Sequence, residues 1–222
     1  MMRYAKIPRA ALLAVLLLLP VGTMAQEPSD QPPLSEADGG LVLDRLGYRL
    51  NLPMPDWLEN ASGPIDGQVG IRTQTDDRQA LLEIRPKGET EALWTTLYGA
   101  RIILATDRPL PQFRAATMAD YAATCQPAQT GFFQLEPDQG DVLPPLGFVC
   151  GAYRDDLSGY AGLGEVAVMS FKKHAGGFVV VFQQWRGAAF DPKVPASWPV
   201  ATDIVQARAN QLQAQTALAV LD

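Results

Sequence analysis

The stretch FVVVFQQW at residues 178–185 decides the fold of this chain. Its first five residues are apolar on both faces of an extended strand, so the strand needs cover on both sides and belongs in the middle of a sheet. Residues 165–172 form a second strand, and the glycine pair at 176–177 can take the positive φ of a tight turn between the two. A further strand begins at Gly147. Residues 147–186 are therefore interpreted as three consecutive antiparallel strands.

Alternating apolar residues predict more strands before this unit. Residues 45–52 alternate strictly between apolar and polar, which is the period of a strand with one solvent-exposed face. Residues 41–44 add a short edge strand before it. Residues 68–73 and 79–85 have the pattern of a second hairpin. This part of the chain is therefore expected to consist of β-hairpins.

The remaining segments are helical, irregular or ambiguous. Residues 93–104 fit one face of a strand and also one face of a helix; β-branched and aromatic residues favour the strand, with Gly99 at a bulge. Helices are predicted at residues 111–124 and 202–219, and residues 126–146 are expected to be a long polar loop. Together these elements predict an α+β domain, in which an antiparallel sheet of hairpins and a three-strand meander carries helices packed on it.

The N-terminal residues 1–25 have the three parts of a secretory signal peptide. A basic start is followed by an apolar run at residues 10–19 and by the small residue Ala25 at the cleavage point. The run is shorter than the roughly 20 residues that span a bilayer, although an uncleaved anchor is the alternative interpretation. Residues 26–40 are rich in proline, glycine and acid and are predicted to be a disordered leader. Residues 41–222 then form a single α+β domain.

The charge of the chain disfavours two classes of partner. It has 18 Lys and Arg residues against 24 Asp and Glu residues. Removing the three basic residues of the signal peptide from the 18 leaves 15 against 24, which makes the mature chain more acidic. An acidic surface repels phosphate backbones and anionic headgroups. We therefore expect no nucleic-acid partner, and no membrane span after signal cleavage; the pattern indicates no particular oligomeric state.

The chain has only two cysteines, Cys125 and Cys150. In an exported protein two cysteines are most simply one disulfide, although two buried free thiols are the alternative. The apolar residues of the helix at 111–124 recur every fourth residue up to Cys125, so its thiol faces the same way as they do. If that face packs on the sheet, Cys125 can reach Cys150. Export and a disulfide together predict a periplasmic or secreted protein.

Residues with recognisable catalytic or cofactor-binding patterns are missing. The single histidine, His174, lies in a hairpin turn beside lysines, where a solvent-exposed side chain is expected. One histidine is too few for the usual zinc or copper sites. The glycine-rich residues 159–164 lack the lysine of a phosphate-binding loop and do not open a helix. We therefore predict no catalytic residues, no metal and no cofactor.

Glu165 is the charged residue of most interest, because it begins an apolar strand. Across the hairpin it should lie opposite Trp185 or Arg186. Two interpretations remain open. Glu165 either forms an exposed cross-strand ion pair, which contributes under about 1 kcal/mol, or is a buried polar anchor. In the second case Trp185 and Tyr153, with Arg186, line a pocket around it.

Some short motifs resemble known families. Residues 48–53, YRLNLP, followed by Trp57, resemble the first strand of PsbP-like domains, in which an alternating strand ends in a proline and a tryptophan follows. The order of the meander and the closing helix is similar too. Residues 88–90 with 94–95, and residues 185–187, are similar to a group of exported bacterial proteins of uncharacterised role. The resemblance implies an accessory or assembly factor and no enzyme.

The expected function is therefore that of an exported periplasmic accessory or binding protein, with an envelope protein as a partner. The alternative is a carboxylate-based hydrolase of the cell envelope. That chemistry requires two acids facing each other across a cleft, about 5–10 Å apart. A structural role and the carriage of a small ligand between sheet and helix also remain open.

Overall fold

The computed structural model describes residues 34–37, 39–59, 63–104, 108–138, 143–174 and 176–221. The predicted signal peptide at residues 1–25 lies outside the described residues, as does the predicted leader up to residue 33. No helix within the described ranges combines the length and the apolar character that crossing a bilayer requires.

The described residues form two sheets, and the larger has seven strands, with every neighbouring pair antiparallel. Its spatial order is β4-β5-β6-β10-β9-β8-β7. The strands are β4 (Val69–Thr75), β5 (Gln79–Pro86), β6 (Thr96–Leu104), β7 (Thr130–Gln134), β8 (Leu146–Cys150), β9 (Leu163–His174) and β10 (Gly177–Ala188). The predicted meander is confirmed as β8, β9 and β10. As expected, β10 lies inside the sheet, between β6 and β9.

The smaller sheet has four strands in the order β1-β2-β3-β11. They are β1 (Leu34–Ala37), β2 (Gly40–Arg45), β3 (Tyr48–Pro53) and β11 (Ala217–Val220). β1 falls within the segment 26–40 that was predicted to be disordered. It pairs with β2 and buries Leu34, so the folded domain begins before the predicted start at residue 41.

The alternating stretch 45–52 was predicted as one strand; its residues 48–52 do lie in β3, but the stretch begins at the end of β2 and includes the turn between the two strands. Leu46 and Gly47 both have positive φ, 56° and 76°, and they join β2 to β3. Positive φ at both central residues is the conformation of a type I′ hairpin turn, whose twist matches that of the flanking strands. The prediction missed the turn because leucine rarely takes positive φ and the apolar alternation continues through it.

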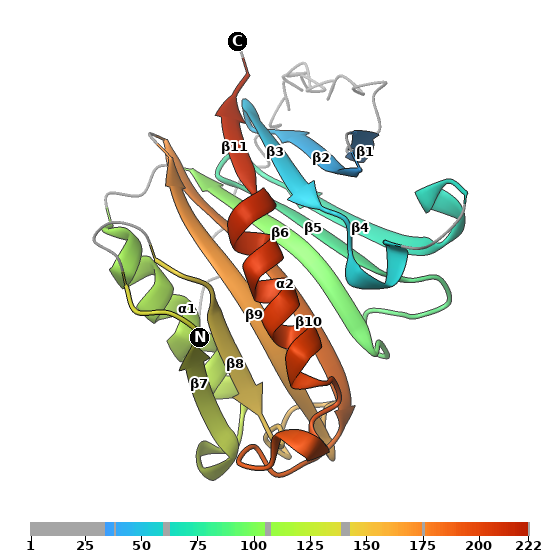
Figure 1. The fold of residues 1–222 in the computed structure, drawn as a ribbon, viewed down its shortest axis with the longest axis vertical. Coiled ribbons are helices and arrows are strands. Elements are labelled where there is room, and N and C mark those ends of the chain that lie inside the picture. The colour runs from blue at the N-terminus through green and yellow to red at the C-terminus, as the bar shows by residue number, and fades with distance from the viewer. Residues whose placement is uncertain are drawn as a thin grey trace, which may run out of the picture. The chain divides into compact units, whose positions relative to one another are not determined.

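The helices among the described residues are α1 (Leu110–Thr124), α2 (Thr202–Gln215) and the short 3₁₀ helices η1 (Asp56–Leu58), η2 (Ile65–Gly67), η3 (Pro127–Gln129) and η4 (Pro195–Ser197). α1 and α2 cover opposite faces of the seven-stranded sheet (Figure 1). Val179 and Val181 of β10 belong to the core on the α2 side, which also takes in the smaller sheet. Phe178, Val180 and Phe182 belong to the core on the α1 side. β10 thus has cover on both faces, and the predicted α+β class is confirmed.

Two strands lie where the sequence predicted a loop or a helix. β7 occupies part of the predicted loop 126–146; it is a short edge strand of half-buried and exposed residues, so no alternation marks it. The predicted helix 202–219 ends at Gln215, and the chain continues into β11 beside β3. The small and apolar residues of β11 are compatible with a helix and with a strand, and pairing with β3 stabilises the strand.

The ambiguous segment 93–104 is extended from Thr96 to Leu104, as expected. Gly99, however, is not at a bulge, because it pairs in register with Phe182 on β10 and with Glu83 on β5. A Cβ atom at this position would lie 2.5 Å from Cζ of the Phe182 ring. Glycine is therefore needed there so that an aromatic ring can pack directly on the strand backbone.

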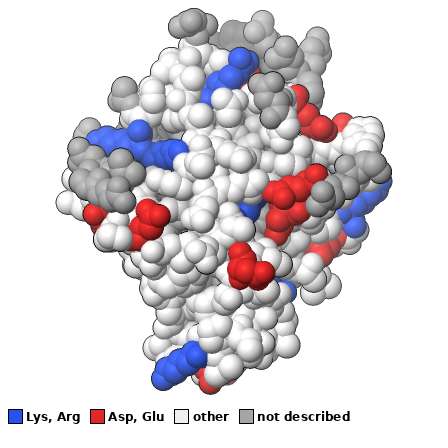
Figure 2. Space-filling model, viewed as in Figure 1, with Lys and Arg blue, Asp and Glu red and all other residues white. Residues whose placement is uncertain are grey.

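The surface on the α2 side carries charges of both signs (Figure 2). Lys and Arg side chains form separate small groups on this face, with groups of Asp and Glu between them. This face therefore offers no extended field of one sign to a charged partner.

Cys125 and Cys150 form the predicted disulfide. Cys125 is the residue that caps the C-terminal end of α1, and Cys150 is the last residue of β8. Their Cα atoms are 5.7 Å apart. The bond ties one end of α1 covalently to the sheet beneath it.

Replacing both cysteines, Cys125→Ala with Cys150→Ala, should lower the free energy of unfolding by roughly 3–4 kcal/mol, because the cross-link restricts the unfolded chain. Urea denaturation followed by tryptophan fluorescence measures the change. The wild-type protein should lose the same amount in a reducing agent, while the double variant should be insensitive to it. Equal stability of the oxidised and reduced wild type would contradict the prediction.

Candidate functional site

A cavity of about 670 Å³, which we name the α1 cavity, lies between α1 and strands β5, β6 and β10. α1 itself packs farther along the sheet. Phe113 stacks on Phe178 with ring centroids 4.6 Å apart, and Tyr121 meets Phe148 edge-on at 5.2 Å. Beyond these contacts the same face of the sheet is not covered by the helix, and side chains of β5 and β6 border the cavity instead of a core.

Charged side chains from the strands, from the β5–β6 connection and from α1 border this cavity. Besides Glu165 and Arg186 they are Arg72, Glu83, Arg85, Glu91, Arg101 and Asp120. Arg72 binds Glu83 at 2.9 Å and Glu91 at 3.3 Å, and Arg85 lies 3.8 Å from Glu91. The charges of these arginine and glutamate side chains thus neutralise one another in part.

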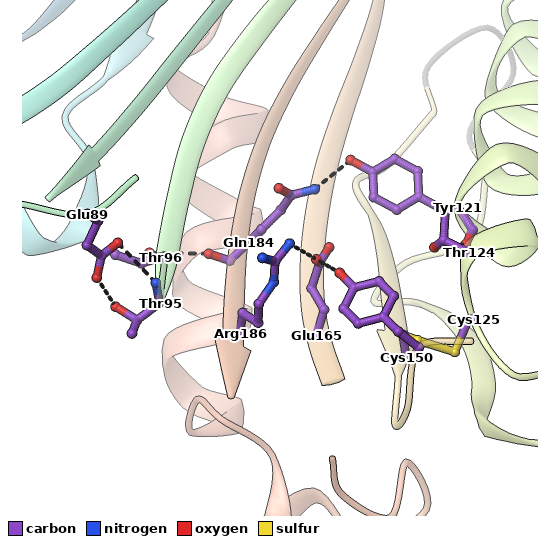
Figure 3. Close-up of polar contacts among 11 residues, drawn as sticks. Glu89, Thr95, Thr96, Tyr121, Thr124, Cys125, Cys150, Glu165, Gln184 and Arg186 are labelled. Atoms are coloured by element: carbon purple, nitrogen blue, oxygen red, sulfur yellow. Dashed lines mark hydrogen bonds and ion pairs between the residues drawn. A yellow bond between two sulfur atoms is a disulfide. The ribbon is translucent and has the colours of Figure 1, made fainter. Parts of the chain in front are cut away.

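Glu165 and Arg186 form a cross-strand pair that is buried (Figure 3). They lie opposite each other on β9 and β10, and the exposed fractions of the two residues are only 2% and 6%. Oε2 of Glu165 is 3.8 Å from Nη2 of Arg186 and accepts a short hydrogen bond from the hydroxyl of Tyr153. Cys150 is the neighbour of Glu165 on β8, so the pair lies directly beside the disulfide. Glu165 thus combines features of both interpretations, because it lies opposite a charged partner across the hairpin and is also buried.

The guanidinium of Arg186 lies close to several aromatic rings. Its Cζ is 3.5 Å from the ring centroid of Trp94 and 4.3 Å from that of Tyr160. Cation–π contacts of this kind stabilise a desolvated arginine. Its Nε and Nη1 are buried and have no hydrogen-bond partner among the described residues. Buried donors without protein partners are uncommon, and a bound water, ion or ligand can satisfy them.

Burial raises the pKa of Glu165 to about 7, although the Tyr153 hydroxyl and the Arg186 charge act in the opposite direction. Burial also raises the pKa of Tyr153 and that of Tyr121. Tyr121 on α1 accepts a hydrogen bond of 2.6 Å from the side-chain amide of Gln184 on β10. A carboxyl group that titrates near neutral pH in a cavity is typical of a functional site.

The structure brings together three of the residues that the sequence proposed for a pocket, namely Tyr153, Glu165 and Arg186. It does not bring Trp185 to them, because successive residues of a strand point to opposite faces. The Trp185 indole lies on the α2 side, where it donates a hydrogen bond of 3.1 Å to Asp56. The place next to Arg186 is taken by Trp94.

A second cavity, the α2 cavity, lies on that opposite side and has a volume of about 600 Å³. Trp57, Trp185 and Arg208 are among the residues around it. Arg208 is buried over the ring of Tyr98, with its Cζ 4.7 Å from the ring centroid, and donates to the Met54 carbonyl at 2.7 Å. Burial lowers its pKa. These contacts hold the segment after β3 against α2.

Sequence reasoning missed Trp94, Tyr160 and Arg208. Trp94 and Tyr160 lie outside strands, and only the long-range pairing of β6 and β9 with β10 brings them beside Arg186. Arg208 lies in the helix predicted at residues 202–219. An arginine in an otherwise small and apolar helix stripe is a weak signal, because its stem can also snorkel to solvent.

The described part of the chain holds no group of three or more His, Cys, Asp or Glu side chains that could bind a metal ion. His174 ends β9, and its ring meets Tyr48 edge-on with centroids 5.4 Å apart. Comparisons of the chain with protein-family models, with curated proteins and with solved structures found no match. The resemblance to PsbP-like domains therefore stays a prediction.

Glu165→Gln should change the pH dependence of stability. The pKa of the carboxyl rises on folding, from 4.5 to about 7, so the folded state binds more protons than the unfolded state in that interval. The free energy of unfolding of the wild type should therefore fall as the pH rises from 4.5 to 7, by roughly 3 kcal/mol from this group alone. The variant lacks this contribution, and its stability relative to the wild type should rise over the same interval.

Urea denaturation at pH 4, 5, 6, 7 and 8 gives both profiles. Glu136→Gln, which removes an exposed carboxylate, controls for the loss of one charge. Parallel profiles for the wild type and Glu165→Gln would show that Glu165 is already ionised below pH 5, and would contradict the prediction.

Proposed function

We propose that this chain is an exported binding or accessory protein of the periplasm that holds a small ligand in the α1 cavity. The observation that supports this best is the buried Arg186, whose Nε and Nη1 have no partner among the described residues and which borders the cavity. A volume of about 670 Å³ is within the range of small-molecule sites, about 300–1,000 Å³. Few convergent polar groups between aromatic walls are also typical of such sites.

Export is supported by the signal-peptide pattern and by the disulfide, since disulfides persist in oxidising compartments. The resemblance to PsbP-like domains adds an accessory role beside an envelope protein partner. In this proposal the partner delivers the ligand or receives it. The antiparallel sheet with helices on it is compatible with the resemblance, but such an architecture is common to many folds.

The ligand can be recovered with the protein. Wild-type protein purified from the periplasmic fraction under native conditions, and then denatured in organic solvent, should release a small molecule in near-stoichiometric amount. Thr117→Trp adds bulk to α1 where it faces the cavity, and this variant should release much less. Mass spectrometry of the two extracts makes the comparison.

Ala207→Trp is the matched control, because Ala207 is exposed and borders the α2 cavity instead. It should carry the ligand like the wild type. Identical extracts from all three proteins would contradict the proposal, and absence of the chain from the periplasmic fraction would contradict its export.

A second candidate function, a carboxylate-based hydrolase, is favoured by one observation. The pKa of Glu165 near 7 suits a general acid, and Glu83 and Asp120 are further carboxylates at the same cavity. Against it, one oxygen of Glu165 is engaged by the hydroxyl of Tyr153.

Incubation of the wild type with peptidoglycan at pH 5 to 8 should release no reducing ends above a buffer blank. The assay measures glycoside hydrolysis directly. Release that Glu165→Gln abolishes and Glu136→Gln retains would establish the hydrolase in place of the binding protein.

A further inference from the structure

The α2 cavity lies on the face of the seven-stranded sheet opposite to the α1 cavity, and it has the size of a binding site of its own. Its volume of about 600 Å³ is within the range of small-molecule sites, about 300–1,000 Å³. Among the described residues, none borders both cavities. A ligand of the α2 cavity would therefore be separate from the ligand proposed for the α1 cavity.

Two side chains around the α2 cavity have buried N–H groups without a partner. Arg208 borders the cavity and is only 2% exposed, and its Nε and Nη2 have no hydrogen-bond partner among the described residues. These two nitrogens share one edge of the guanidinium, so they can donate two parallel hydrogen bonds. The buried Nε1 of Trp57, which also borders the cavity, has no partner there either. Oxygen atoms of a ligand can satisfy such donors.

The charge of Arg208 is balanced by carboxylates of the protein. Asp56 and Glu59 border the same cavity, and Oε1 of Glu59 lies 3.9 Å from Nη1 of Arg208. Burial lowers the pKa of Arg208, and the charges of both carboxylates act in the opposite direction. The unpaired N–H groups therefore require oxygen acceptors and not a further counter-ion, which favours a neutral ligand.

The two carboxylates are held in position by hydrogen bonds. Oδ2 of Asp56 accepts one of 3.1 Å from the Trp185 indole, and Oδ1 accepts one of 2.9 Å from the Trp57 backbone N–H. Oε1 of Glu59 accepts one of 2.8 Å from the side-chain amide of Gln211. An ionised carboxylate has about four acceptor positions, so both can accept more. The site thus offers donors and acceptors, and a hydroxyl group, which both donates and accepts, matches the two kinds.

The rest of the cavity wall is aromatic and aliphatic. Trp57 and Trp185 border it, and α2 contributes Ile204 and Ala207. Trp57 is half-buried and Ile204 is 44% exposed, so this wall reaches the protein surface. An indole combines a large apolar ring with an N–H at its edge. A pyranose ring complements it, because its C–H groups form an apolar face and its hydroxyl groups project from the rim.

We infer that the α2 cavity binds a neutral saccharide through a pyranose ring that packs against Trp57 and Trp185. Neighbouring hydroxyl oxygens of the sugar accept hydrogen bonds from Nε and Nη2 of Arg208. Its hydroxyl groups donate to the carboxylates of Asp56 and Glu59. The inference goes beyond the proposed function, because it assigns a second site with a ligand of its own.

Nuclear magnetic resonance of the indole N–H groups tests both the binding and its place. The chain has four tryptophans; Trp57 and Trp185 border the α2 cavity, whereas Trp94 borders the α1 cavity. The methyl β-glycosides of glucose, galactose and mannose are titrated separately into ¹⁵N-labelled protein from the periplasmic fraction. At least one should shift the Trp57 and Trp185 signals saturably and leave the Trp94 signal unchanged. Single Trp→Phe variants identify the signals.

Two further probes separate ring packing from hydrogen bonding. Sorbitol has the hydroxyl groups of a hexose without the ring, and cyclohexylmethanol has a six-membered ring with one hydroxyl group. Each should bind at least tenfold more weakly than the best glycoside, because the site requires both features. Either probe binding as tightly as that glycoside would overturn the inference.

A matched pair of variants blocks one cavity at a time. Ala207→Trp adds bulk at an exposed position of α2 beside the α2 cavity and should weaken the glycoside at least tenfold. Thr117→Trp adds the same side chain beside the α1 cavity and should change the affinity less than twofold. Circular dichroism establishes that both are folded. Should Ala207→Trp fail to fold, Trp57→Phe is the second variant; it keeps an aromatic ring, loses the N–H and should weaken binding roughly three- to tenfold.

Three results would overturn the inference: no saturable shift with any of the three glycosides, shifts centred on Trp94, or unchanged binding to the folded α2-cavity variant. Each of them leaves the proposed function standing. That function is decided by the ligand extraction, in which Thr117→Trp loses the ligand and Ala207→Trp retains it.

Discussion

The bond between Cys125 and Cys150 fixes where α1 can lie, and the position of α1 makes the space beneath it. Cys150 is paired with Glu165, and Glu165 with Arg186, so one row of residues across β8, β9 and β10 joins the disulfide to the buried charges. The helix is anchored at the row where the polar site begins. Its other contacts with the sheet include ring contacts, such as that of Phe113 with Phe178, and the hydrogen bond from Gln184 to Tyr121.

The buried pair of Glu165 and Arg186 is hard to explain as a device for stability. Removing two charges from water costs several kcal/mol, and a buried ion pair is often no more stabilising than apolar residues of similar volume. Here the separation of 3.8 Å is too long for a hydrogen bond, and Arg186 has donors without partners among the described residues. An apolar pair would extend the neighbouring core of Ala167 and Phe182 without those costs. The charges are better explained by the binding role proposed for the α1 cavity.

Local patterns in the sequence were sufficient to predict the framework of this domain. The apolar run of β10, the glycine turn before it and the two cysteines gave the meander, its central strand and the disulfide. The hairpin register also placed Glu165 opposite Trp185 or Arg186, and the structure pairs it with Arg186. Elements that depend on distant partners were missed: β11 is a strand because β3 lies beside it, and Trp94 borders the site because β6 pairs with β10. The prediction for Trp185 was wrong for a local reason, since it ignored the alternation of side chains along a strand.

The composition of β10 changes along its length: its first part packs in the cores, and its last part borders the cavities. Residues 178–182 are apolar on both faces and belong to both cores. Residues 183–186 carry polar or amphipathic side chains on both faces: Gln184 and Arg186 border the α1 cavity, and Trp185 borders the α2 cavity. Residues 178–182 are held by two cores and Trp185 by the core on the α2 side, so the polar side chains between and after them are kept in fixed positions. A rigid central strand of this kind is well suited to position a binding site.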